Sequence, residues 1–118
     1  MTGESILLSV KKILGIEPDY TYFDVDLIIH INSVLSVLYQ LGVGKQAFSI
    51  SDSGSTWSDF LGDDSAQLND VKTYVALRVR LLFDPPTVGA VMESLKQTIS
   101  ELEWRINVTV DPGEIQNG

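Results

Sequence analysis

The sequence predicts an all-α fold: a small bundle of about four helices plus a short helical turn, with a long loop and an extended C-terminal tail. In two long stretches, apolar residues recur every three or four positions, as along one face of a helix. They are Leu68, Val71, Val75, Val79 and Leu82, then Val88, Met92, Leu95, Ile99, Leu102 and Ile106. Between them Pro85 and Pro86 end the first helix near Phe83, because proline supplies no amide hydrogen. Thr87 is placed to cap the second helix, so two helices joined at a rigid corner form the predicted scaffold.

Length and composition predict a single domain. A chain of 118 residues, 44% of them hydrophobic, can bury one modest core. We assign residues 1–107 to a helical domain that contains the loop 42–58, and residues 108–118 to the tail. No apolar run approaches the roughly 20 residues that cross a bilayer. The first residues lack a signal-peptide pattern and the chain has no cysteine. We therefore expect a cytosolic origin, no membrane contact and no disulfide or thiolate metal site.

The charge balance argues against a protein that grips nucleic acid. Lys and Arg supply most of such affinity by neutralising phosphates, but only eight are present and they are scattered, in a chain of net charge −8. An acidic surface would instead let DNA slide past without sticking.

Two helices are predicted in the first half of the chain. The first ends at Gly15, which can adopt the left-handed conformation that stops a helix. After a linker whose aromatic residues we expect to fold over the core, the second helix begins at Asp24 or Asp26 and runs to about Leu41. The apolar stripes are Ile6, Leu7, Val10, Ile13 and Leu14 in the first helix, and Leu27, Ile28, Ile31, Val34, Leu35, Leu38 and Leu41 in the second.

Three side chains do not suit their positions in a monomer. Ile29 and Val37 interrupt the polar side of the second helix. They are either single exposed apolar residues, which are common, or contacts with another subunit. Arg78 falls near the middle of the apolar face of the helix that ends near Phe83, so it needs a carboxylate partner, within the domain or on a neighbour.

Residues 42–58 read as a long loop rich in Gly and Ser. Phe48 and Ile50 alternate with serines, as in a short strand or an extended arm. Such a long loop in a small domain usually has a function or is disordered. Thr56 then opens a capping pattern for a short helix that ends at Gly62 and is pinned to the core by Trp57.

The tail offers two interpretations. Val108 and Val110 alternate with Thr109, and a Pro-Gly pair follows. Since so short a segment buries little of itself, it is either frayed or a strand that adds to a partner's sheet edge.

Catalytic chemistry is not expected. Asp26 and His30 share a helix face with Asp24 nearby, but a catalytic metal usually needs three protein ligands with supporting residues, and there is no second histidine. The Gly-Val-Gly-Lys segment at 42–45 lacks the spacing of a phosphate-binding loop. We therefore predict a protein that is not an enzyme and has no cofactor or metal site.

Six segments carry a resemblance to a known family: residues 28–34, 40–44, 56–62, 71–75, 78–87 and 103–107. The most distinctive are Arg-Leu-Leu-Phe-Asp-Pro-Pro at 80–86 and Trp-Ser-Asp-Phe-Leu-Gly at 57–62. With them the chain resembles the small helical head–tail connector proteins of tailed bacteriophages, also called adaptor or DNA-packaging proteins. The resemblance implies a structural virion protein, assembled in the host cytoplasm, that forms a ring beneath the portal at the head–tail junction.

The same resemblance implies partners and contacts. The ring would extend the channel through which DNA passes without sequence-specific binding, and would offer a docking surface to tail-completion proteins. In this family the long loop and the C-terminal segment, here residues 48–55 and 108–115, reach neighbouring subunits or the portal. The candidate interface residues are Ile29, Val37, Phe48, Ile50, Arg78, Val108, Val110 and Ile115. Two alternatives stay open: a dimeric intracellular helical regulatory or binding module, and a metal-dependent hydrolase centred on Asp26 and His30.

Overall fold

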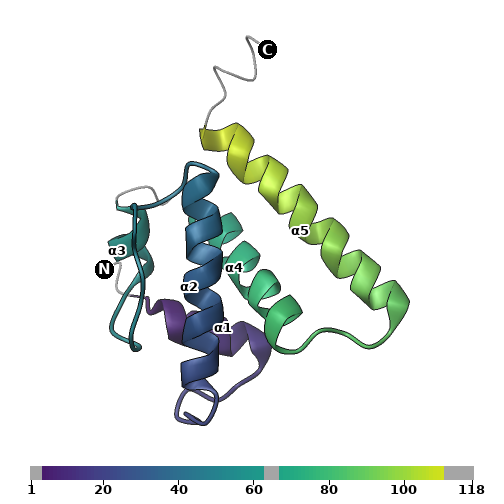
Figure 1. Cartoon of the computed structure of the whole chain (residues 1–118), viewed down its shortest axis with the longest axis horizontal. Helices are drawn as coiled ribbons and strands as arrows, with labels where there is room; N and C mark the ends of the chain where they lie inside the picture. The colour runs from purple at the N-terminus through teal and green to yellow at the C-terminus, as the bar shows by residue number, and fades with distance from the viewer. Residues whose placement is uncertain (1–3, 63–66, 111–118) are drawn as a thin grey trace.

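The computed structural model describes residues 4–62 and 67–110, and in these ranges the fold is all-α, as the sequence predicts (Figure 1). The helices are α1 (Ile6–Leu14), α2 (Asp24–Gln40), α3 (Trp57–Leu61), α4 (Leu68–Phe83) and α5 (Gly89–Val110). Helix α4 lies in the middle and packs against α1 and α2 on one side and α5 on the other. None of the described helices is long and apolar enough to cross a membrane.

Local sequence signals define the ends of the short helices. The Ser5 hydroxyl accepts a hydrogen bond from the Leu8 amide at the start of α1, and Gly15 ends it with φ 81°. At α3 the Thr56 hydroxyl accepts from the Asp59 amide (3.2 Å), while the Asp59 carboxylate accepts from the Thr56 amide (2.9 Å). The predicted caps at Gly15 and Thr56 are confirmed.

The proline corner lies where it is predicted. Helix α4 ends at Phe83, directly before Asp84 and the two prolines. Helix α5 begins at Gly89, with the Val88 carbonyl accepting from the Met92 amide (3.0 Å). The start of α5 is therefore one residue later than a cap at Thr87 implies.

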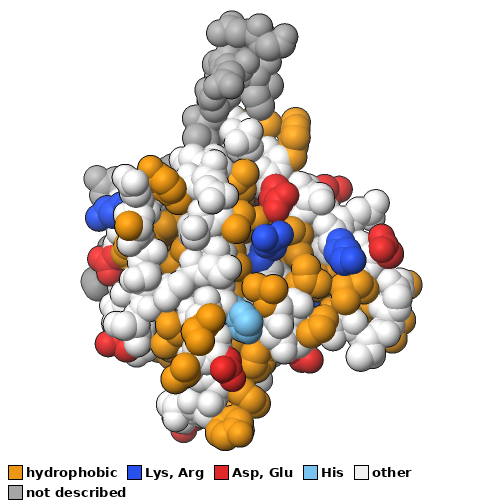
Figure 2. All heavy atoms as spheres, viewed as in Figure 1, with side chains coloured by type: hydrophobic (Ala, Val, Ile, Leu, Met, Phe, Trp, Pro, Cys, Tyr) orange, Lys and Arg blue, Asp and Glu red, His pale blue; other side chains and the backbone are white. Residues whose placement is uncertain are grey.

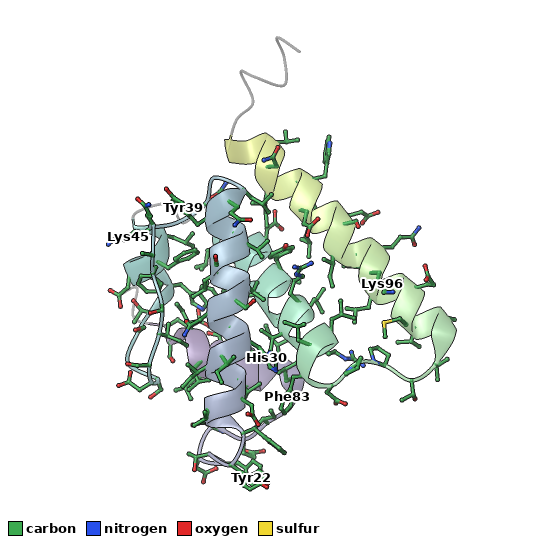
Figure 3. All side chains as sticks on the ribbon, viewed as in Figure 1. Tyr22, His30, Tyr39, Lys45, Phe83 and Lys96 are labelled. Atoms are coloured by element: carbon green, nitrogen blue, oxygen red, sulfur yellow. The ribbon has the colours of Figure 1, made fainter. Side chains whose placement is uncertain are left out.

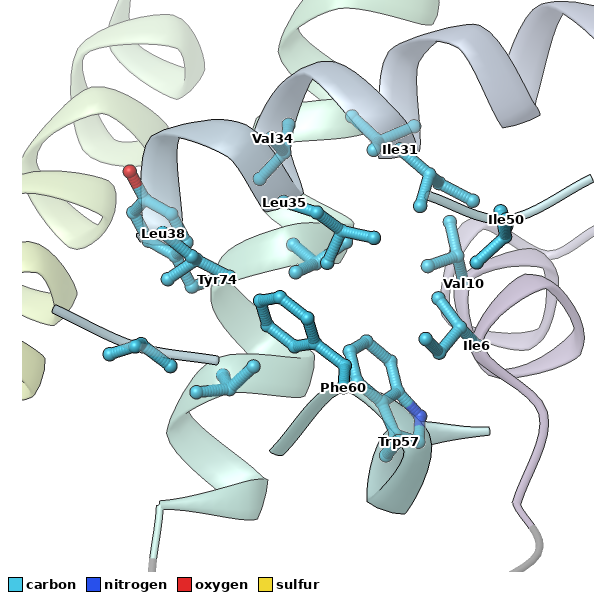
Figure 4. Packing of buried hydrophobic residues seen from close by; sticks show 14 of the residues in the cluster. Ile6, Val10, Ile31, Val34, Leu35, Leu38, Ile50, Trp57, Phe60 and Tyr74 are labelled. Atoms are coloured by element: carbon cyan, nitrogen blue, oxygen red, sulfur yellow. The ribbon is translucent and has the colours of Figure 1, made fainter. Parts of the chain in front are cut away.

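The core gathers residues from all five helices and from the loop before α3 (Figure 4). Trp57, Phe60 and Tyr74 are among its largest fully buried side chains. The indole N–H of Trp57 donates to the Ser9 hydroxyl (3.0 Å), which ties α3 to α1. Gly44, with φ 84°, lies so close to the Phe60 ring that a β-carbon there would overlap it. The prediction that Trp57 pins α3 to the core is confirmed.

Several apolar side chains predicted to be inside lie at the surface. Leu82 is 51% exposed and Ile13 is 49% exposed, and Tyr20 and Tyr22 of the linker are exposed as well. The 3-4 spacing places a residue on a helix face, but it does not say whether another element covers that part of the face. These predictions were wrong because nothing in the described fold packs over those positions.

The C-terminal segment begins as a helix. Helix α5 continues through Val110, so residues 108–110 are not extended. Adding a residue to an existing helix is favourable once nucleation is complete, and this outweighs the weak strand preference of a Val-Thr-Val run. The rest of the predicted tail, including Ile115, lies outside the described residues.

Candidate functional site: the interaction surfaces

The loop between α2 and α3 is attached to its own domain. The Asn32 side chain accepts a hydrogen bond from the Ile50 amide (2.7 Å) and donates one to the Ile50 carbonyl (3.0 Å). Ile50 is only 3% exposed, and the Phe48 ring packs against Phe60 at a centroid distance of 5.3 Å. The expectation of a short strand at Phe48–Ile50 was therefore wrong; the segment has no regular structure and is held to α2, because Asn32 satisfies the Ile50 backbone. The longest exposed parts of the loop are residues 44–47 and the turn at residues 51–54.

Arg78 finds its carboxylate within the domain. Its guanidinium lies 3.6 Å from Glu103 on α5 and 5.8 Å above the Tyr74 ring. The Tyr74 hydroxyl donates to the same carboxylate (2.7 Å). Burial and this hydrogen bond raise the pKa of Tyr74 above its ordinary value. The prediction that Arg78 pairs with a carboxylate is confirmed, and this ion pair joins α4 to α5.

Helix α5 has a covered side and an open side. On the covered side Leu95, Ile99, Leu102 and Ile106 are buried, as predicted. Arg105 lies 3.3 Å from Asp70 of α4, and Asn107 donates to the Leu41 carbonyl (3.4 Å). On the opposite, open side Trp104 is 69% exposed. Val88 and Val91 are exposed as well, but they line a hollow beside the proline corner at the start of α5, so the prediction that Val88 is buried with the stripe was wrong.

The predicted interface residues thus fall in different places. Ile29 is 60% exposed on the outer side of α2, while Val37 is half-buried. Val108 is half-buried near the end of α5. The Val110 side chain and Ile115 lie outside the described part of the structure.

A cluster of exposed aromatic side chains lies where α1 connects to α2. We call Tyr20, Tyr22, Phe23 and Val25 the aromatic tip. The Tyr22 and Phe23 rings meet edge to face at 4.9 Å, and Phe23 contacts Phe83 at the end of α4 at 5.1 Å. Tyr22 is 77% exposed, and Figure 3 shows it at the far end of α2 from Tyr39. Apolar side chains are exposed at this end of the molecule, as they are elsewhere on the same face (Figure 2).

One buried lysine holds the base of the aromatic tip. The Lys11 side chain is 1% exposed, and its ammonium donates to the Pro18 carbonyl (3.1 Å), the Tyr20 carbonyl (2.8 Å) and the Asp24 carboxylate (2.8 Å). Sequence reasoning missed this role. The available signal was the position of Lys11 between Leu7 and Leu14, which places it on the apolar stripe of α1.

Of the two acidic residues near His30, Asp24 serves another contact and Asp26 is exposed. Asp24 accepts from Lys11, and the His30 ring lies 6.4 Å from the Phe83 ring. Across residues 4–62 and 67–110, no group of three or more His, Cys, Asp or Glu side chains is arranged to hold a metal ion.

Comparison with known proteins supplies the family. Residues 6–113, almost the whole chain, match a family model described as phage connector protein. Searches of curated proteins and of solved structures gave no match. The match confirms the resemblance carried by the Trp-Ser-Asp-Phe-Leu-Gly and Arg-Leu-Leu-Phe-Asp-Pro-Pro segments. This chain is a member of the phage connector protein family.

Proposed function

We propose that this protein is a head–tail connector that forms a ring beneath the portal of a tailed bacteriophage. The ring extends the DNA channel and provides a docking surface for tail-completion proteins. Assembly takes place in the host cytoplasm, and the finished ring belongs to the virion. Family membership supports the connector role. The ring, the channel and the partners are the content of the proposal.

The observation that carries the proposal is a pair of separate exposed apolar surfaces. One is the outer side of α2 at Ile29, and the other is the open side of α5 at Trp104. A closed ring is built from heterologous contacts, in which two different patches of each subunit meet. Large exposed apolar side chains at two places fit that requirement better than the single self-complementary patch of a dimer.

The other candidate residues fit this assembly unequally. We leave Ile50 out of the interface because its side chain is buried in its own core, and Arg78 because it is paired with Glu103. Val37 and Phe48 are half-buried, so only part of each side chain can contact a neighbouring subunit. Residues 108–115, with Val110 and Ile115, are proposed to reach a neighbouring subunit or the portal.

The charge of the chain supports a channel function. With a net charge of −8, the protein repels phosphates and does not hold DNA in place. The face in Figure 2 carries its acidic side chains singly among apolar ones. We therefore assign this face to protein contacts, and expect the lumen to be lined from another side of the protomer.

Substitutions on the two surfaces test the ring. Wild-type protein, Ile29→Ser and Trp104→Ser are mixed with the portal protein of the same phage and imaged by negative stain, with native mass spectrometry for the subunit number. Both variants should keep the wild-type thermal midpoint, because both side chains are exposed, yet fail to form rings. Leu8→Ser, at an exposed apolar position on α1, is the matched control and should assemble normally.

Two results would contradict the proposal. A wild-type protein that forms only a closed dimer, with or without the portal, would favour the regulatory-module alternative. Rings that form equally well in both variants would show that these surfaces are not the subunit contacts. A monomer in the absence of the portal contradicts nothing, since ring contacts can form on the portal itself.

A further inference from the structure

We propose that the aromatic tip is a preformed docking element for a second protein, one that presents an apolar hollow rimmed by Lys and Arg. This inference rests on the proposed function, because it assigns one surface of the connector to a partner other than its own copies. The two tyrosines of the tip precede α2, whereas the ring contacts use the outer side of α2 at Ile29 and the open side of α5. Val25, which lies one helical turn before Ile29 on the same side of α2, is where the two surfaces adjoin.

The aromatic tip presents apolar surface that its own chain does not cover. Tyr20, Tyr22 and Val25 are all exposed, and they lie on one short stretch at the end of the molecule. The Tyr20 and Tyr22 rings stand 6.3 Å apart and both contact Phe23, which is half-buried. Tyrosines are enriched at the centres of protein interfaces, because they bury a large ring with few rotatable bonds.

The tip is held in one conformation before any partner arrives. All three hydrogens of the Lys11 ammonium are used, on two carbonyls of the linker and on Asp24 at the start of α2. A buried ammonium cannot lose these acceptors without leaving a desolvated charge, so the linker is fixed to α1. A rigid docking element loses little conformational freedom on binding, which strengthens the complex.

The charge around the tip identifies the kind of partner. Glu17, Asp19 and Asp26 are exposed there, and none forms an ion pair with another described residue. Arg80 and Asp84 line the hollow beside Phe23, and their charges offset each other. The tip is therefore apolar with an acidic border, and the complementary surface is apolar with a basic border.

A second copy of this chain does not offer such a surface. Of its eight basic residues, Lys11 is buried and Lys72, Arg78 and Arg105 form ion pairs within the protomer. The remaining four are Lys12 on α1, Lys45 in the loop, Arg80 on α4 and Lys96 on α5. Because they stand singly on different elements, they form no basic border, and the partner is a different polypeptide.

Binding measurements on tip variants test this assignment. The probes are the portal protein and the tail-completion protein of the same phage, each immobilised for biolayer interferometry. The double variant Tyr20→Ser/Tyr22→Ser should bind one of the two probes at least about tenfold more weakly than wild type. The matched control is Tyr39→Ser, an exposed tyrosine at the other end of α2, and its affinity should stay within about twofold (Figure 3).

Salt dependence tests the acidic border. The double variant Glu17→Gln/Asp19→Asn should associate with the same probe more slowly at low salt and depend less on ionic strength than wild type. Glu93→Gln, an exposed acid on α5, should leave both quantities unchanged.

Lys11→Met tests the preformed state, with the exposed neighbour Lys12→Met as its control. Methionine keeps most of the buried chain but removes the three hydrogen bonds. Amide hydrogen exchange across residues 17–23 should speed up by about tenfold or more in Lys11→Met alone. The affinity of Lys11→Met for the probe should fall as well, while Lys12→Met should match wild type.

Each contrary result has a distinct meaning. If wild type binds a probe and the tip variants bind it equally well, the docking assignment is overturned and the connector function stands. If the tip variants change self-assembly without any probe, the occupant is a second copy and the assignment is again overturned. If wild type binds neither probe, the proposed function and this inference fail together.

Discussion

At the scale of single residues, this small core tolerates charge only where every polar atom has a partner. Within the described ranges, no buried side-chain nitrogen or oxygen lacks a hydrogen-bond partner. Lys11 is the extreme case, because an unpaired ammonium at that depth would cost several kcal/mol. Tyr74 and Arg78 meet the same requirement by sharing the Glu103 carboxylate. The sequence pattern showed that Arg78, on an apolar helix face, needs a charged partner. The same requirement at Lys11 was overlooked.

The shared carboxylate predicts a pH dependence at Tyr74. The unfolded chain releases the tyrosine proton near its ordinary pKa of about 10, while burial and Glu103 raise the pKa in the folded state. The folded state therefore keeps a proton that the unfolded state loses, and the stability from Tyr74 is complete below pH ~10 and declines above it.

Urea unfolding of wild type and Tyr74→Phe at several pH values measures this effect. At pH 7 the variant should lose about 1 kcal/mol, since one hydrogen bond is removed. The difference from wild type should shrink or reverse above pH ~10. Tyr39→Phe, which alters an exposed hydroxyl, is the control. A difference that is constant from pH 7 to 11 would contradict the account.

At the scale of elements, helix ends follow from neighbours in the sequence, whereas loop positions do not. The capping box at Thr56 and Asp59, the left-handed Gly15 and the proline pair after Asp84 act over three or four residues, and the structure has all of them where they are predicted. The path of the loop depends instead on Asn32, which lies 18 residues before Ile50.

Removing the Asn32 side chain should release the loop. Asn32→Ala leaves the Ile50 amide and carbonyl without their partner, so we expect a loss of about 2 kcal/mol in unfolding free energy. Amide exchange at Ile50 should accelerate more than exchange in α4. Ser33→Ala, at the next and exposed position of α2, should change neither quantity by more than about 0.5 kcal/mol. Unchanged exchange at Ile50 would show that the loop is held by Phe48 and Phe60 alone.

At the scale of the whole molecule, α5 is attached less extensively than the other long helices. It packs on α4, whereas α4 also packs on α1 and α2, and Figure 1 shows α5 crossing the outer side of the bundle. Its Trp104 side points away from the core. A connector whose α5 contacts a neighbour would gain much of its final stability on assembly.

Native-state hydrogen exchange should therefore show α5 opening at a lower free energy than α4. Leu102→Ala removes a buried contact of α5 and should lower the protection of α5 amides by about 2–3 kcal/mol, with a smaller effect on α2. Val91→Ala, at an exposed position of the same helix, should have little effect on the free protomer. Equal protection of α4 and α5 in the wild type would mean that the bundle opens as one unit.

The sequence by itself determined the fold class, the helix ends at Gly15, Thr56 and Phe83, the face that α5 turns to the core and the need for a carboxylate at Arg78, because each depends on residues within a few positions of one another. Only the tertiary structure decided that Leu82 and Tyr22 stay exposed and that Lys11 is buried. A residue's burial depends on whether a distant segment covers it, and no local spacing carries that information.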